Sequence, residues 1–246
     1  MTEKQFFQKL SETLQAELTL AGETNEKFFV RLQKLLQQNI GDLRTKEGEE
    51  RSKQLRKIFV GAGYNKYWQQ LRSQFDKLLD SQNRLWKEET TAAGLLARGN
   101  IRLLSLEKVE FAKFGSLGDK AVKELKKQFD QGFSENWTRQ QLIEAITPIN
   151  QKTEAYGSAI ADTALRGWDR TVTATKAEIV GVDEAMFDGP PPIETSHEFC
   201  IEHYQEVLSR EEIESLSNGE LDPVITYGGG YNCRHHWRWL IREILK

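Results

Sequence analysis

The sequence has few cysteines and prolines, and it has no long apolar run. Its 246 residues include two cysteines and five prolines, too few for a disulfide scaffold or a proline-rich chain. No stretch approaches the roughly 20 apolar residues of a membrane span, and the N-terminus lacks the apolar core of a signal peptide. We therefore expect no membrane partner, and synthesis and folding in a cytoplasm.

An excess of positive charge is also absent. The formal net charge is -3, whereas a protein that coats DNA by neutralising phosphates is usually clearly basic. Any contact with DNA therefore needs a local basic patch. Hydrophobic residues make up 38% of the chain and charged residues 29%, which is typical of a globular domain and excludes a disordered chain.

Helical periodicity dominates the first two-thirds of the chain. Apolar residues recur at three- and four-residue spacing over 6–43 and again over 55–79, which indicates amphipathic helices packed on one another. Glycine is unfavourable inside a helix. We therefore predict interruptions at 22–25, 61–63 and 115–118, a loop or frayed end at 44–53, and a hinge or domain edge at 92–100.

Two further signals mark helices in the second half of the chain. Thr138 and Gln141 form a capping box that begins a helix, and Pro148 marks the end of that helix or a kink in it. The segment 153–177 carries several small residues, which let neighbouring helices approach closely. We expect that helix to be central.

Short elements follow from residue 178. The patterns predict strands at 178–182, 185–187 and 223–226, and helices at 197–204, 210–216 and 236–245. The predicted fold is mainly α with a small α+β C-terminal module. We predict a helical N-terminal region over 1–100 and a domain over 101–246, in which helices span 104–177 and the module spans 178–246.

Both cysteines and all four histidines lie in the last fifty residues. Cys200 and His203 form one C-x2-H pair, and Cys233 and His236 form another; together they offer the four ligands of a tetrahedral zinc site. Three interpretations stand, in this order: two buried thiols with surface histidines, the zinc site, and a disulfide between the cysteines. A Cys/His nucleophile lacks an identifiable third orienting group.

The end of the chain also resembles a known family. The segments 218–224 and 228–235, together with Cys200 after Thr195 and Ser196, resemble the C-terminal signature of phage Mu F-like minor head proteins (head morphogenesis family). The residues that define the module are then Cys200, Asn232, Cys233, Arg234 and His235. Two positions depart from the common pattern: His235 stands where a cysteine is usual, and His197-Glu198 replaces an Arg-Pro.

The resemblance implies a virion protein that is present in few copies. It implies a place in the capsid interior or at the portal vertex, partners among the portal and other virion proteins and packaged DNA, and a part in head morphogenesis, packaging or ejection. No catalysis and no small-molecule substrate are expected. Two alternatives from other classes are a nucleic-acid-binding protein built on a zinc knuckle and an effector enzyme.

A last pattern concerns surface charge. Four basic residues at four-residue spacing would form one stripe on the predicted terminal helix, able to contact an acidic portal surface or DNA phosphates. The alternative is an ordinary solvated helix face. The residues are Arg234, Arg238, Arg242 and Lys246.

Overall fold

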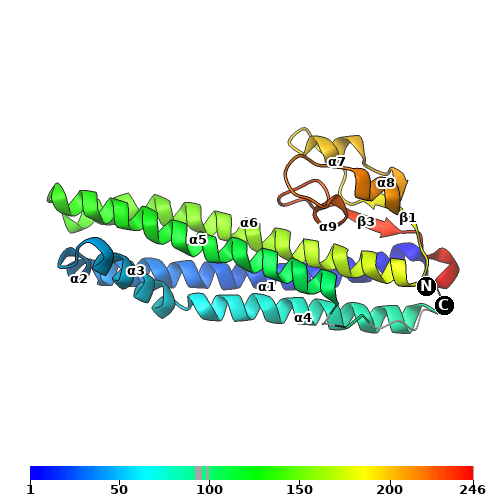
Figure 1. The fold of residues 1–246 in the computed structure, drawn as a ribbon, viewed down its shortest axis with the longest axis horizontal. Coiled ribbons are helices and arrows are strands. Elements are labelled where there is room, and N and C mark those ends of the chain that lie inside the picture. Colours follow the sequence, from blue (N-terminus) through cyan, green and yellow to red (C-terminus); the bar gives the residue numbers. More distant parts are fainter. Residues whose placement is uncertain (92–95, 98–99, 246) are drawn as a thin grey trace. The chain divides into compact units, whose positions relative to one another are not determined.

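The computed structural model describes residues 1–91, 96–97 and 100–245. The protein is mainly helical, with a small antiparallel sheet near the C-terminus (Figure 1), so the predicted mixture of a helical body and a small α+β module is confirmed. None of the described helices combines the length and the apolar character that crossing a bilayer requires. The long helices are α1 (Glu3–Gln38), α4 (Tyr64–Glu89), α5 (Ile101–Ser134) and α6 (Arg139–Ile179).

The chain divides into two compact units. The terminal unit comprises Met1–Thr19, Arg72–Lys108 and Ala159–Lys246, and the central unit comprises Leu20–Leu71 and Val109–Ser158. Each unit is therefore assembled from segments that are distant in sequence. The division into a region over 1–100 and a Mu F-like domain over 101–246 stays a prediction. Most of the predicted hinge at 92–100, including Gly94 and Gly99, lies outside the described residues.

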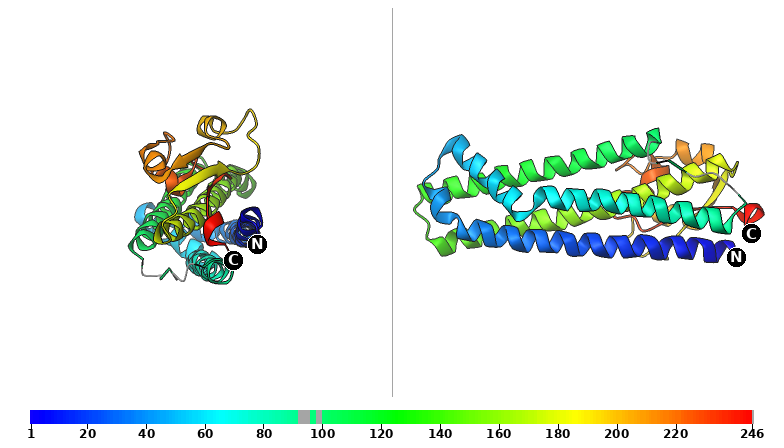
Figure 2. Two further views of the ribbon diagram at one scale, coloured as in Figure 1. Left: turned by 90° about the vertical axis from the view of Figure 1, so that its right-hand side faces the viewer. Right: turned by 90° about the horizontal axis from the view of Figure 1, so that it is seen from below.

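The central unit is a helical assembly with an apolar core. Between α1 and α4 lie two shorter helices, α2 (Ile40–Arg44) and α3 (Gly48–Ala62), which fold back along the C-terminal part of α1 (Figure 2). Residues from both stripes predicted in the sequence are buried in it, as expected for packed amphipathic helices. They include Phe28, Phe29, Leu32, Leu36, Leu55, Ile58 and Phe59.

Two of the predicted glycine interruptions are wrong. Helix α1 continues through 22–25, because the buried Asn25 side chain donates hydrogen bonds to the Glu154 carbonyl and the Ser158 hydroxyl at 3.0 and 2.7 Å. Helix α5 continues through 115–118, where the Gly118 amide donates to the Tyr64 hydroxyl at 3.1 Å. Tertiary packing outweighs the cost of glycine, which is only about 1 kcal/mol.

The other predicted signals hold in part. The third interruption is confirmed, because Gly63 ends α3 in the left-handed conformation. The Thr138–Gln141 capping box is confirmed by hydrogen bonds in both directions at the start of α6. The predicted helix end at Pro148 is wrong, because α6 runs through Pro148 and also contains the whole segment 153–177. The polar run at 44–53 is a short turn followed by the start of α3.

The terminal unit carries the sheet, whose strands lie in the order β2-β1-β3. The strands are β1 (Glu184–Asp188), β2 (Val207–Ser209) and β3 (His236–Trp239), all paired antiparallel. Ala185 pairs with Trp239 and Phe187 with Trp237. These four side chains are buried in one core cluster that includes Ala174 and Ala177 of α6. The predicted strand at 185–187 is confirmed.

Short helices complete this part of the chain. The predicted helices near 197–204 and 210–216 are confirmed as α7 (Glu198–Glu202) and α8 (Arg210–Ser215). The other predictions fail: 178–182 is the end of α6 and a turn, and 223–226 contains helix α9 (Val224–Tyr227). The predicted helix at 236–245 is replaced by β3 and the 3-10 turn η1 (Arg242–Ile244).

Candidate metal centre

The two cysteines meet inside the terminal unit. Cys200 lies in α7 and Cys233 in the loop between α9 and β3, and both side chains are buried. Their sulfur atoms are 3.6 Å apart, and both thiols are free. The two halves of the C-terminal signature, separated by about thirty residues of chain, therefore converge on one point.

His235 completes a group of three potential ligands. Its Nδ1 lies 3.9 Å from the Cys233 sulfur, and its Nε2 lies 2.9 Å from the Pro190 carbonyl oxygen. A carbonyl only accepts, so Nε2 carries the proton and donates to Pro190. The Nδ1 atom is left to face the sulfurs. Histidines that bind metals usually donate their other ring N–H to a carbonyl or carboxylate in this way, which fixes the ring.

The spacing of the three atoms fits a tetrahedral zinc ion. Zinc–sulfur bonds of about 2.3 Å and zinc–nitrogen bonds of about 2.0 Å give tetrahedral edges of about 3.8 Å between sulfurs and about 3.5 Å from sulfur to nitrogen. The distances here are 3.6 and 3.9 Å, and all three ligand atoms lie within 4.8 Å of one another. Two thiolates and an imidazole are the donors that zinc prefers.

The glycine-rich loop makes room for this group. A Cβ atom at Gly229 would overlap the Cys200 sulfur and lie 3.5 Å from the Cys233 sulfur. At Gly228, which adopts the left-handed φ of 56°, a Cβ would lie 3.1 Å from the Cys233 sulfur. A side chain at either position would therefore displace the ligands. The backbone of this loop therefore forms a closely packed wall of the site.

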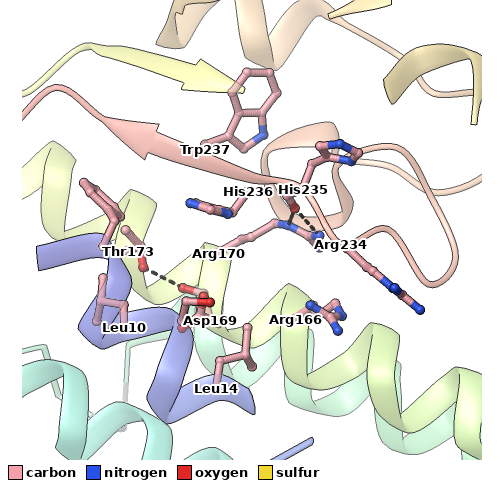
Figure 3. A pocket seen from close by; sticks show the side chains of 12 residues that line it. Leu10, Leu14, Arg166, Asp169, Arg170, Thr173, Arg234, His235, His236 and Trp237 are labelled. Atoms are coloured by element: carbon pink, nitrogen blue, oxygen red, sulfur yellow. Dashed lines mark hydrogen bonds between the residues drawn. The ribbon is translucent and has the colours of Figure 1, made fainter. Parts of the chain in front are cut away.

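A buried arginine of α6 holds the loop through hydrogen bonds to its backbone carbonyls. Arg170 of α6 donates from Nε to the His235 carbonyl at 2.9 Å, from Nη2 to the Cys233 carbonyl at 2.6 Å and from Nη1 to the Thr226 carbonyl at 3.3 Å. Figure 3 shows this side chain reaching from α6 to the backbone of His235. Its burial lowers the pKa of Arg170, yet three carbonyl acceptors keep the buried charge satisfied.

The electrostatics favour one thiolate within the pair. A hydrogen bond from the Cys200 thiol lowers the pKa of Cys233, and the charge of Arg170 and the amide of Gly229 lower that pKa further. The same hydrogen bond and burial raise the pKa of Cys200. Cys233 is therefore the cysteine that is ionised before a metal arrives. Metal binding would displace the remaining proton from Cys200.

The structure separates His203 and His236 from the cysteines. His203 bonds through Nδ1 to the Glu206 carboxylate at 2.6 Å, and its ring packs on Phe199. His236 belongs to β3, with its ring stacked 6.2 Å from that of Phe7. Burial lowers the pKa of His236 to about 4. Of the four predicted ligands, the structure brings together only Cys200 and Cys233, and His235 supplies the third.

The predicted basic stripe is wrong because its residues do not share a helix. Arg234 is exposed in the loop, and Arg238 lies in β3, where it pairs with Asp188 at 2.8 Å and with the buried Glu3. Arg242 also lies 3.4 Å from Glu3, and Lys246 is outside the described residues. The four-residue spacing forms a stripe only on a helix. Arg238 lies in a strand, where side chains alternate between faces instead.

Two pockets flank the group. An open pocket of about 440 Å³ has Cys200, Cys233 and His235 in its wall, together with His197. A second pocket, drawn in Figure 3, holds only about 40 Å³ and is lined by Arg170, Asp169 and His236 among others. The second pocket has room for little more than one or two water molecules. A bound molecule would therefore meet the cysteines from the larger pocket.

Sequence reasoning identified Asn232 but missed the other residues that support the group. Asn232, one of the module-defining residues, has a left-handed φ of 56°, and its amide donates to Thr163 of α6. Arg170 resembles any helical arginine in sequence, and the carbonyl of Pro190 carries no signal. No family model, curated protein or solved structure matches the chain.

Proposed function

We propose that this chain is a minor head protein of a phage, similar to the Mu F-like family, and that it acts structurally at the portal vertex. In this role it contributes to head morphogenesis and to genome packaging or ejection. The observation that carries the proposal is the convergence of Cys200 with the loop containing Asn232 and Cys233. Three of the residues that carry the resemblance, Cys200, Cys233 and His235, are buried and meet in one site, as a signature that maintains a module requires.

The role of the site is to hold the module together. Cys200, Cys233 and His235 join α7 to the loop before β3, and Arg170 joins that loop to α6. Their side chains are buried, and each interaction links segments distant in sequence. We propose zinc as the ion that the three residues hold. A small module with a limited core gains folding free energy from such an ion.

The test of the portal proposal is association with the portal protein of the virus that encodes the chain. The two proteins are expressed together, with an affinity tag on the portal alone, and the portal oligomer is isolated and separated by size. We expect the chain to elute with the oligomer. A portal protein from an unrelated phage serves as the control and should carry none of the chain.

Two further outcomes sharpen this experiment. Mass spectrometry of purified virions is expected to detect the chain at a few copies per particle. A chain that never elutes with its portal and is absent from virions would overturn the proposal. Neither measurement depends on metal content, so the portal proposal and the zinc proposal can fail separately.

A further inference from the structure

Three protein ligands leave a tetrahedral zinc ion one ligand short. Structural zinc sites have four protein ligands, whereas a site with three keeps a position open for water or substrate. The identity of the fourth ligand therefore determines whether this centre is closed and structural or open to the larger pocket. One further candidate, a histidine, lines the same pocket wall but lies outside the group of ligand atoms within 4.8 Å of one another.

That candidate is His197, the residue that caps the N-terminus of α7. It precedes Cys200 by three residues, and its carbonyl accepts from the Cys200 amide at 2.9 Å, so the two residues share one turn. A Cβ placed at Gly229 would lie 3.6 Å from the His197 Cβ and 3.5 Å from the Cys233 sulfur, besides overlapping the Cys200 sulfur. The His197 side chain therefore starts at the edge of the site.

The surroundings of His197 suit a metal ligand. Its Nε2 lies 2.8 Å from the Tyr231 carbonyl, and its Nδ1 lies 3.6 Å from the Glu220 carboxylate. Glu220 is anchored in the loop, because its Oε2 accepts from the Tyr231 amide at 3.1 Å. Oxygen acceptors therefore lie near both ring nitrogens. Carboxylates and carbonyls in this position orient metal-bound histidines.

Resting on the proposed zinc site, we infer that His197 is the fourth zinc ligand and closes the centre as a Cys2His2 site. The ring reaches the ion by rotating about its side-chain bonds, and a side chain that is one-third exposed has room for this. The ligand set is then His197 and Cys200 from the start of α7, with Cys233 and His235 from the loop before β3. His203 and His236 remain outside it.

X-ray absorption on the zinc-loaded full chain tests this inference, because its fine structure counts sulfur and imidazole ligands. We expect two sulfurs and two imidazoles. In His197→Gln one imidazole should disappear, and zinc affinity, measured by competition with a chelator, should fall at least about tenfold. His203→Gln is the matched control, being close in sequence and outside the ligand set, and should bind zinc like the unaltered chain.

The outcomes separate the two proposals. Two sulfurs with one imidazole and one oxygen in the unaltered chain, and an unchanged affinity in His197→Gln, would overturn the fourth ligand while zinc itself stands. Absence of bound zinc would overturn both the ion and its fourth ligand. The number of imidazole ligands in the unaltered chain decides whether His197 binds zinc even if His197→Gln does not fold. Circular dichroism would reveal such a folding defect.

Discussion

The guanidinium of Arg170 donates to the carbonyl oxygen of Cys233 at 2.6 Å, and the same nitrogen also bonds the His235 carbonyl. A residue of the long helix α6 therefore holds the backbone on both sides of Arg234. This relationship makes the C-terminal loop part of the core of the terminal unit. The same two bonds make residues 232–235 a single structural element.

Replacing Arg170 by methionine should destabilise the protein by about 3 kcal/mol, because three buried carbonyls lose their donor. Urea denaturation followed by circular dichroism measures the change. The matched control is Arg166→Met, one turn earlier in α6, where the arginine pairs with Asp162 on its own helix. This half-buried pair joins residues one turn apart on a single helix, and such pairs contribute about 0.5 kcal/mol. Equal losses in the two variants would contradict the role given to Arg170.

Removal of metal should destabilise the module. An ion that binds only the folded state stabilises it by about 2.7 kcal/mol at a free concentration one hundred times its dissociation constant. We therefore expect a strong chelator to lower the denaturation midpoint of the unaltered chain, and added zinc to restore it. In Cys233→Ser the chelator should have no effect. A midpoint that does not respond to chelator in the unaltered chain would argue against a structural ion.

Gly229→Ala should damage the site, since the added methyl overlaps the Cys200 sulfur. We expect a loss of zinc affinity together with a loss of stability of about 2 kcal/mol, the usual cost of overpacking. Gly22→Ala is the comparison. Gly22 lies within helix α1 with nothing within 4 Å of the new Cβ, so this change should stabilise by up to about 1 kcal/mol. Equal destabilisation of both variants would indicate that the chain does not tolerate alanine in place of glycine in general, rather than at this site in particular.

Lys176→Met should stabilise the protein. Lys176 is buried beside the Trp86 ring at 5.8 Å, and its Nζ has no hydrogen-bond partner among the described residues. Burial lowers the pKa of Lys176 to about 8 from 10.5. Each pKa unit corresponds to about 1.4 kcal/mol, so removing this charge should add about 2 to 3 kcal/mol at neutral pH.

The sign of the pH dependence follows from the same shift. Between pH 8 and 10.5 the unfolded lysine holds a proton that the folded one has lost, so the stability of the unaltered chain rises with pH in that window. The advantage of Lys176→Met should therefore shrink from pH 8 upward. This decrease is measured by the denaturation midpoints of the unaltered chain and of Lys176→Met across this pH range. An advantage that stays constant with pH would show that Lys176 is not the titrating group.

Local patterns predicted the helical body well, because burial on one face of a helix repeats visibly in sequence. The capping box at Thr138 and the interruption at Gly63 are local signals, and both are confirmed. The interruptions at Gly22 and Gly118 failed because contacts from distant segments override the cost of glycine. A single sequence does not show those contacts, such as that between Asn25 and Ser158.

The site was predicted in part. The clustering of cysteines and histidines at the C-terminus pointed to Cys200 and Cys233. The histidines were assigned by C-x2-H spacing, which assumes that each pair shares one turn. Cys233 and His235 instead lie in the segment just before β3 and are both buried, whereas His236 begins that strand and stacks on Phe7. The supporting role of Arg170 depends wholly on tertiary structure.

Zinc content is the measurement that tests the central claim most directly. The full chain is purified without a histidine tag, and metal is determined by elemental analysis with a thiol count alongside. A zinc-held module predicts about one zinc per chain, lost in Cys200→Ser and in Cys233→Ser and retained in His203→Gln. A folded chain with no zinc and two free thiols would contradict it.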